Sequence, residues 1–286
     1  MFNILPAPDR TPPPKAHPDD FDIIQAYQTL KALRPFILAL DVAYVLFIWK
    51  GAEFLANLEL DRKLLRYLSV IWNGFNCITS LLMFCALLPE FLTSLSNGYH
   101  YTVCKQGTAY SGRYSGLAMY AFCLSKIWEL GDTVLLAMRG RKIIFLHSFH
   151  HCIVMIQVCF TYYTAGSMAR LGTVMNSGVH SIMYFYFAVQ NVAPGIRCIA
   201  STITVLQMSQ FVVACTGMVS LVGYVLSGHQ CDTQYEMIAM HFAIYLIFLA
   251  LFLKFFFNSY LSKGGQQKAR IHNKTETQSN GKVHAE

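Results

Sequence analysis

Seven long apolar stretches divide this sequence, and they restrict the chain to a helical fold that spans a membrane. They lie near residues 36–56, 67–89, 115–138, 143–164, 170–190, 199–226 and 236–258. Each is long enough to cross the hydrocarbon core of a bilayer, which takes about 20 helical residues. Because these stretches account for most of the 286 residues, we expect one membrane domain, residues 31–260, and no second soluble domain. A composition of 55% hydrophobic and 13% charged residues agrees with this class.

The two ends of the chain differ from the middle in composition. Residues 1–30 begin with a proline-rich segment, and residues 261–286 are polar and basic, so we expect both to be disordered. Most lysines and arginines outside the apolar stretches fall on the side of the C-terminus, which favours a luminal N-terminus and a cytosolic C-terminus. The glycosylation sequon at Asn273 would then lie unused in the cytosol.

Two of the nine cysteines lie in loops rather than in apolar stretches. Cys104 and Cys231 both fall on the predicted luminal side, where an oxidising environment permits a disulfide. We therefore predict a bridge between them.

Polar side chains interrupt four of the apolar stretches. His147, His150 and His151 occupy positions i, i+3 and i+4, so they share one face of a helix. Histidine within a bilayer is costly, and this cluster is therefore a functional hypothesis. The other polar groups are Lys126, Glu129, Asp132 and Thr133 in the third stretch, Asn176, His180, Tyr184 and Tyr186 in the fifth, and Thr204, Gln207 and Gln210 in the sixth.

These groups lie at a common depth, between roughly 6 and 18 Å from the predicted cytosolic surface at about 1.5 Å per helical residue. We therefore expect one buried pocket that opens toward the cytosol. Structural alternatives stay open for its parts. Lys126 and Glu129 can form a structural ion pair, and Gln207 with Gln210 can simply link helices. His241 lies nearer the luminal end, and we expect a structural role for it.

The histidine cluster admits metal chemistry and metal-free chemistry. A di-iron centre needs about eight ligands, and only four histidines reach this depth, so iron is under-supplied. A single zinc site stays an alternative, but metal-free nucleophilic or acid–base catalysis by histidine fits the residues better. A basic rim suits a phosphate-bearing substrate, although the positive-inside rule alone also explains it. The rim consists of Arg139, Arg141, Lys142 and Lys254.

The order and spacing of these motifs resemble the family of very-long-chain fatty acid elongases. The resemblance runs from the second to the seventh stretch. It consists of Lys126, Glu129, Asp132 and Thr133, then His147, His150 and His151, then Asn176, His180, Met183, Tyr184 and Tyr186, then Thr204, Gln207 and Gln210. A seven-helix receptor is the non-enzyme alternative, but the chain has neither an Asp-Arg-Tyr triplet after the third stretch nor an Asn-Pro-x-x-Tyr string in the seventh.

The resemblance implies a condensing enzyme, a 3-ketoacyl-CoA synthase. It would join a long-chain acyl-CoA to malonyl-CoA and release CoA and carbon dioxide, without metal or cofactor. It implies an all-α membrane protein of the endoplasmic reticulum with seven transmembrane helices. Six of them would form a barrel around an acyl tunnel, with the first helix outside. It further implies membrane lipid as surroundings, a homodimer or other enzymes of the elongation cycle as partners, and no nucleic acid.

The resemblance also suggests residue roles and departures. His150, or else His151 or His147, would take the acyl group, His180 would assist at the enolate, and Asn176 with Gln207 would stabilise oxyanions. Phe187 stands where the family has a second tyrosine, and Lys142 stands where members acting on polyunsaturated chains have glutamine. The chain therefore looks closer to the branch for saturated and monounsaturated acyl groups. Its C-terminus, ending at Glu286, is not a clean dilysine retrieval signal.

Overall fold

In the computed structural model, residues 17–58, 60–162, 164 and 166–262 are described, and all regular elements within these ranges are helices. Four helical segments are long and apolar enough to cross a membrane: Ile23–Ala56, Arg62–Ser96, Pro194–Leu226 and Met237–Leu261. These segments support a multi-pass membrane protein. The first part of the leader, the basic tail from residue 263 onward and the sequon at Asn273 lie outside the described residues.

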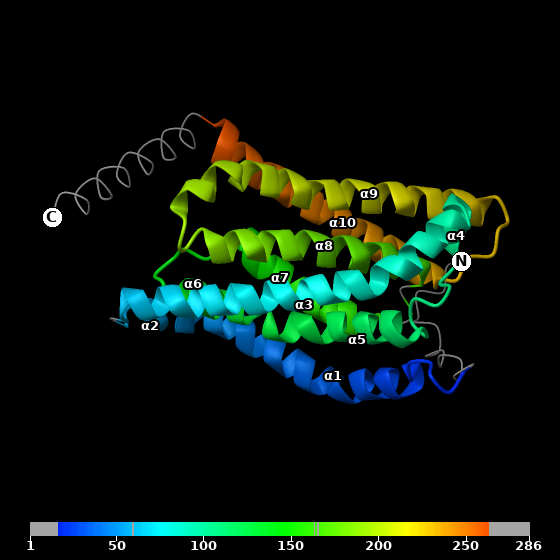
Figure 1. Ribbon diagram of the computed structural model, residues 1–286, viewed down its shortest axis with the longest axis horizontal. Coiled ribbons are helices and arrows are strands. Elements are labelled where there is room, and N and C mark those ends of the chain that lie inside the picture. Colours follow the sequence, from blue (N-terminus) through cyan, green and yellow to red (C-terminus); the bar gives the residue numbers. More distant parts are fainter. Residues whose placement is uncertain (1–16, 59, 163, 165, 263–286) are drawn as a thin grey trace.

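Helices occupy all seven apolar stretches, as Figure 1 shows. The helices are α1 (Ile23–Leu46), which continues through a π-helical turn (Phe47–Gly51) into α2 (Ala52–Ala56), then α3 (Arg62–Ser96), α4 (Tyr99–Cys104), α5 (Arg113–Trp128), α6 (Gly131–Met138), α7 (Phe145–Phe160), α8 (Ser167–Val189), α9 (Ala200–Leu226), preceded by a 3-10 turn (Pro194–Ile199), and α10 (Tyr235–Phe256), followed by a π-helical turn (Phe257–Leu261).

Helix α1 begins well before the expected start of the first span at residue 36. The Asp22 side chain accepts a hydrogen bond from the backbone N–H of Gln25 at 2.9 Å and so caps the helix. The first two turns bury one side in the core, through Ile23, Ala26, Tyr27 and Leu30. The expectation of disorder up to residue 30 is therefore wrong for these turns, because a capped, half-apolar helix can pack although its hydropathy is below that of a span.

The third apolar stretch, expected as one helix over 115–138, is broken. Helix α5 ends at Trp128 and α6 begins at Gly131, with a tight turn between them. A side chain at Gly131 would meet the ring of Trp72 on α3 at 2.5 Å. Because glycine has no side chain, the backbone at this position can approach that ring closely.

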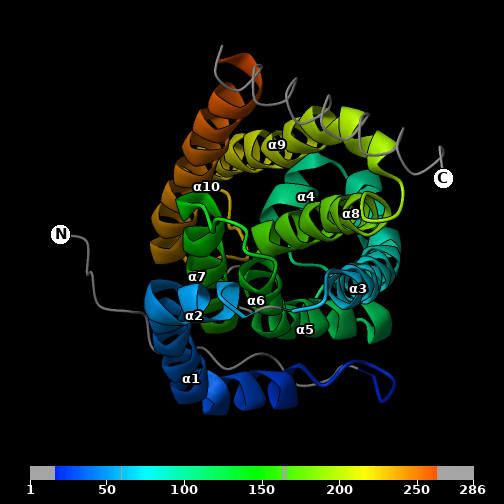
Figure 2. The same ribbon diagram turned by 90° about the vertical axis from the view of Figure 1, so that its left-hand side faces the viewer.

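The long helices contact one another in a closed cycle. Helix α3 packs against α8, α8 against α9, α9 against α10, α10 against α7, α7 against α5, and α5 against α3. Helix α1 lies outside this cycle and contacts α7 and α5, which the view along the bundle in Figure 2 shows.

One end of the bundle, which we call the disulfide end, is built from α4 and the loops around it. Cys104 at the end of α4 is joined to Cys231 in the loop between α9 and α10. Beside this bridge, the ammonium group of Lys105 lies 3.4 Å from the carboxylate of Asp232. Gly166 has a φ of 68°, and a side chain there would collide with the backbone at Asp232. These contacts attach the two loops to each other and to the start of α8.

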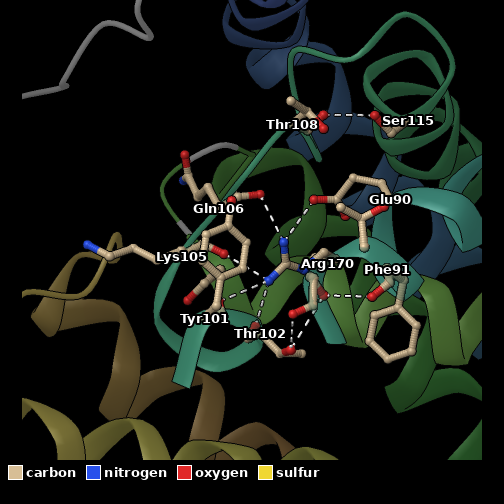
Figure 3. A network of polar contacts seen from close by, with 12 residues as sticks. Glu90, Phe91, Tyr101, Thr102, Lys105, Gln106, Thr108, Ser115 and Arg170 are labelled. Atoms are coloured by element: carbon tan, nitrogen blue, oxygen red, sulfur yellow. Dashed lines mark hydrogen bonds and ion pairs between the residues drawn. The ribbon is translucent and has the colours of Figure 1, made fainter. Parts of the chain in front are cut away.

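Arg170 on α8 holds the same end from within. Its guanidinium is completely buried, forms an ion pair with Glu90 of α3 at 2.8 Å, and donates to the backbone carbonyls of the α4 segment, as Figure 3 shows. The acceptors are the carbonyls of Tyr101, Thr102, Lys105 and Gln106, at 2.7–3.3 Å. One side chain thus binds four carbonyls of this segment, and two of them, those of Tyr101 and Gln106, also accept from the backbone N–H groups of Lys105 and Ala109.

The opposite end, which we call the basic end, is where α6 finishes and where α7 and α9 begin (Figure 1). Arginines gather there: Arg66, Arg139, Arg141 and Arg197.

Candidate functional site

Two cavities lie side by side within the bundle and share part of their lining. The larger, of about 410 Å³, lies toward the basic end, and the smaller is about 110 Å³. His150, Gln210 and Phe211 line both cavities and so mark their junction. The larger cavity is lined by most of the residues predicted for the pocket: Asp132, His147, His150, His151, His180, Tyr184, Tyr186, Thr204, Gln207 and Gln210.

The smaller cavity extends from His150 to the loop between α9 and α10, where Thr233 lines it. Its wall is largely apolar and includes Phe122, Val154, Met218 and Leu221. His241 also lines this cavity and binds the carbonyl of Met237 through Nδ1 at 2.7 Å. Although away from the other histidines, His241 is therefore part of a cavity wall.

Four polar side chains from two helical segments form a closed cluster that touches both cavities, since Asn176 lines the smaller and His180 the larger. The ammonium of Lys126 donates to Glu129 at 2.7 Å and to the side-chain oxygen of Asn176 at 3.2 Å. The Asn176 amide lies 3.2 Å from Nε2 of His180, and Nδ1 of His180 lies 3.8 Å from Glu129. Lys126 and Glu129 are only 4% and 2% exposed, so their charges are compensated within the cluster.

This cluster fixes the protonation pattern of the His180 ring. Lysine can only donate, so the oxygen of Asn176 must face Lys126 and the amide nitrogen must face His180. Nε2 of His180 is therefore an acceptor, and in the neutral ring the proton sits on Nδ1. That N–H faces the second oxygen of Glu129, which has no hydrogen-bond partner among the described residues.

Asp132, just inside α6, is held by donors from two other helices. The indole N–H of Trp72 donates to one carboxylate oxygen at 2.6 Å, and the hydroxyl of Tyr184 donates to the other at 2.7 Å. This arrangement joins α3, α6 and α8 at the wall of the larger cavity. Trp72 carries no motif that would have marked it in the sequence.

The three histidines of α7 differ in their surroundings. Nε2 of His147 lies 2.9 Å from the hydroxyl of Thr133, and its ring lies 4.4 Å from that of His151. The centroid of the His150 ring lies 5.3 Å from that of the His151 ring and 5.2 Å from that of the Phe248 ring. Within the described part of the chain, no hydrogen bond engages either nitrogen of His150. His150 thus lines both cavities and has no hydrogen-bond partner among the described residues.

The amide side chains of α9 face the same space. Gln207 contacts the sulfur of Met183 at 3.0 Å, and Gln210 is buried between the two cavities. Thr204 lies 3.2 Å from the hydroxyl of Tyr260, which the sequence did not single out and which also lines the larger cavity.

The predicted basic rim is only partly brought together. Arg139 lines the larger cavity, whereas Arg141 and Lys142 are exposed nearby and Lys254 is exposed without lining it. Burial and the positive charges of Arg141, Arg197 and Arg66 lower the pKa of Arg139. Arg66 and Arg197, which were not predicted as part of the basic rim, therefore lie close enough to Arg139 to act on its charge.

The arrangement of possible metal ligands was predicted as an alternative and can be compared with the structure. Among the residues that the structure describes, no group of three or more histidine, cysteine, aspartate or glutamate side chains is arranged to hold a metal ion.

Known proteins are similar to this sequence over most of its length. The ELO family (GNS1/SUR4 family) matches residues 29–268. A very long chain fatty acid elongase 6 of Drosophila melanogaster is 34% identical over 234 residues, which cover 80% of this chain and 73% of that protein. A long chain fatty acid elongase 2 of Caenorhabditis elegans is 30% identical over 243 residues, 82% of this chain and 86% of that protein. A putative fatty acid elongase 3 of the same organism is 31% identical over 233 residues, 79% of this chain and 71% of that protein. Because the family match covers most of the sequence, the chain belongs to the ELO (GNS1/SUR4) family.

Proposed function

We propose that this protein is the condensing enzyme of fatty acid elongation, which converts an acyl-CoA and malonyl-CoA into a 3-ketoacyl-CoA, CoA and carbon dioxide. The observation that carries this proposal is the position of His150. Its imidazole lies where the two cavities meet, and its nitrogens are unengaged among the described residues. The relatives reported above are named as fatty acid elongases, which supports a role in fatty acid elongation.

The shapes of the two cavities suggest how the substrate lies. The apolar smaller cavity suits the hydrocarbon chain, and the larger cavity leads to Arg139, which suits the phosphates of CoA. The thioester would then lie beside His150. The closed cycle of helix contacts supports a barrel of six helices around an acyl tunnel, with α1 outside.

The reaction follows from a nucleophilic imidazole. A nitrogen of His150 attacks the thioester carbonyl, the C–S bond breaks, and CoA leaves as a thiolate that takes a proton from solvent. Malonyl-CoA then loses carbon dioxide to give an enolate. The enolate carbon attacks the acyl-imidazolium, a C–C bond forms, the C–N bond breaks, and neutral His150 is restored.

The other side chains have roles that fit their partners. Asn176 uses one amide N–H toward His180, which leaves its second N–H for an oxyanion. Gln207 faces the larger cavity and can donate to the other oxyanion. His180, with its orientation set by Asn176 and Glu129, would assist at the enolate. Lys126, Glu129, Asp132, Thr133, Tyr184 and Gln210 hold these groups in place.

The cellular setting is proposed with the reaction. The basic end would face the cytosol, where both CoA thioesters are soluble, and the disulfide end would face the lumen of the endoplasmic reticulum. Lys142 supports preference for saturated or monounsaturated acyl groups. The other enzymes of the elongation cycle, or a second copy of the chain, are the expected partners.

A malonyl-CoA-dependent assay in membranes tests the reaction. Wild-type protein is expected to lengthen labelled acyl-CoA by two carbons, and His150→Ala is expected to lose at least about a thousandfold, as removal of a nucleophile does. His229→Ala is the matched control, because His229 is an exposed histidine at the disulfide end. Full activity of His150→Ala would remove His150 as the nucleophile, and a lack of elongation with every acyl-CoA would remove the proposed function.

Two measurements separate the acyl-enzyme route from direct attack within a ternary complex. Acyl-CoA alone is expected to add one acyl mass to the His150 peptide. Double-reciprocal plots are expected to be parallel. Intersecting lines, together with an unmodified peptide, would favour the ternary complex.

A further inference from the structure

Helix α1 lies outside the cycle of helices, yet it buries two polar side chains against the histidine helix and its neighbour. Asp41 is 8% exposed, and Tyr44 is 5% exposed. They are three residues apart and therefore share a face. Polar groups buried within a membrane are costly and mark functional positions.

Tyr44 is the start of a chain of hydrogen bonds that ends on a histidine. Its hydroxyl lies 2.9 Å from the hydroxyl of Thr133 in α6, and the same threonine lies 2.9 Å from Nε2 of His147. Thr133 is completely buried, so no water competes for it. Neither Tyr44 nor Thr133 lines either of the two cavities described above.

The second polar side chain, Asp41, lies one turn before Tyr44 on α1 and contacts the histidine helix α7. One carboxylate oxygen of Asp41 lies 3.1 Å from the sulfur of Cys152, which directly follows His151. The other oxygen of Asp41 is buried and has no partner among the described residues. Helix α1 thus reaches the segment that carries the three histidines directly through Asp41 and, by way of Thr133, through Tyr44.

The chemistry of the three groups favours one direction for the protons. A phenol is a good donor and a poor acceptor, so the hydroxyl of Tyr44 donates a hydrogen bond to the hydroxyl oxygen of Thr133. The hydroxyl of Thr133 in turn donates a hydrogen bond to Nε2 of His147. Nε2 is then an acceptor, and the proton of the neutral ring lies on Nδ1. The opposite direction would require Tyr44 to accept and to find another acceptor for its own proton.

We propose that Tyr44 is a positioning residue which, through Thr133, fixes the tautomer and orientation of His147. His147 in turn packs against His151, which packs against His150. The first helix is therefore part of the support of the reacting imidazole. This inference rests on the proposed function for its kinetic consequences, but not for its effect on the His147 ring.

Kinetics of hydroxyl-deletion variants test the support of catalysis. Tyr44→Phe is expected to lower kcat about tenfold and to leave KM for acyl-CoA within about twofold, because a buried hydrogen bond is lost away from the cavities. Thr133→Val is expected to have at least the same effect, Thr133→Ser to restore most of kcat, and Tyr44→Phe to add nothing in the Thr133→Val background. Additive losses in the double variant would overturn the relay.

Tyr162→Phe is the matched control. Tyr162 is a buried tyrosine, 4% exposed, whose hydroxyl has no hydrogen-bond partner among the described residues. Its kcat is expected to equal that of the wild type. A drop equal to that of Tyr44→Phe would show that loss of any buried hydroxyl has this effect and would overturn the specific role.

Reactivity of His147 tests the inference without any reference to elongation. Diethylpyrocarbonate modifies an imidazole nitrogen that has a free lone pair, and peptide mass spectrometry gives the rate at His147. Tyr44→Phe and Thr133→Val are expected to raise this rate at least about threefold, while Tyr162→Phe leaves it unchanged. An unchanged rate in all variants overturns the relay, whereas a raised rate with a wild type that elongates nothing would leave the relay standing and remove the proposed function.

Discussion

The ion pair between Lys126 and Glu129 places two opposite charges in the interior of the bundle. Both charges lie far from water, and they are tolerated because Ser125, Asn176 and His180 complete their surroundings. A buried pair gives little net stability compared with apolar residues, but removal of one partner leaves the other charge uncompensated. The pair therefore holds a polar arrangement rather than a tight core.

Glu129→Gln is expected to lower the free energy of unfolding by about 3–5 kcal/mol, because Lys126 keeps its charge without a counter-ion. Thermal unfolding in detergent measures this. The double variant Lys126→Met with Glu129→Leu is expected to recover much of the stability without recovering activity. Glu53→Gln, on the exposed surface of α2, is the control. If the Glu129→Gln variant had the same free energy of unfolding as the wild type, Glu129 would not be the counter-ion that Lys126 requires.

At the scale of elements, the break between α5 and α6 sets the position of Asp132. Gly131 lets the backbone rest on Trp72, and the indole of Trp72 then reaches Asp132. Asp132 thus begins α6 at the wall of the larger cavity, held by donors from α3 and α8.

Gly131→Ala is expected to destabilise the protein by about 1–3 kcal/mol, because the added carbon overlaps the rigid indole. Gly74→Ala on α3 is the matched control. A side chain there meets nothing within 4 Å, so the change is expected to be neutral or to stabilise by about 0.5–1 kcal/mol through helix propensity. The two variants are compared by unfolding in detergent and by activity. Equal behaviour would show that the approach of Gly131 to Trp72 is not required.

At the scale of the whole molecule, the two ends of the bundle are built differently. Four arginines lie together at the basic end, whereas a covalent bridge and the buried Arg170 attach the loops of the disulfide end. The smaller cavity runs toward that attached end. The scaffold is therefore firm where the hydrocarbon chain would end.

Reduction of the Cys104–Cys231 bridge is expected to lower the stability of the wild type by about 2–5 kcal/mol, since the bridge closes a loop of 127 residues in sequence. Thermal unfolding with and without a phosphine reductant gives the difference. The variant with both cysteines changed to serine is expected to show no response to the reductant. A response equal to that of the wild type would place the effect at another cysteine.

Much of this organisation could be predicted from the sequence, because hydropathy and helical spacing act locally. The apolar stretches coincide with helices, and polar groups of separate stretches, such as Asp132 and His180, line one cavity. The break at Gly131 and the early start of α1 were missed, since both depend on packing partners. Tyr44, Trp72 and Tyr260 could not be found either. Each is an ordinary aromatic residue whose role arises only from a contact with a distant helix.

The order of helices around the cycle has a consequence for biosynthesis. Helix α10 comes last in sequence among the helices of the cycle, and it completes the cycle by packing between α9 and α7. Until it inserts, the cavity and its charged lining face lipid on one side, an arrangement that the membrane disfavours. We therefore expect a chain truncated before α10 to be less stable in the membrane than the full chain.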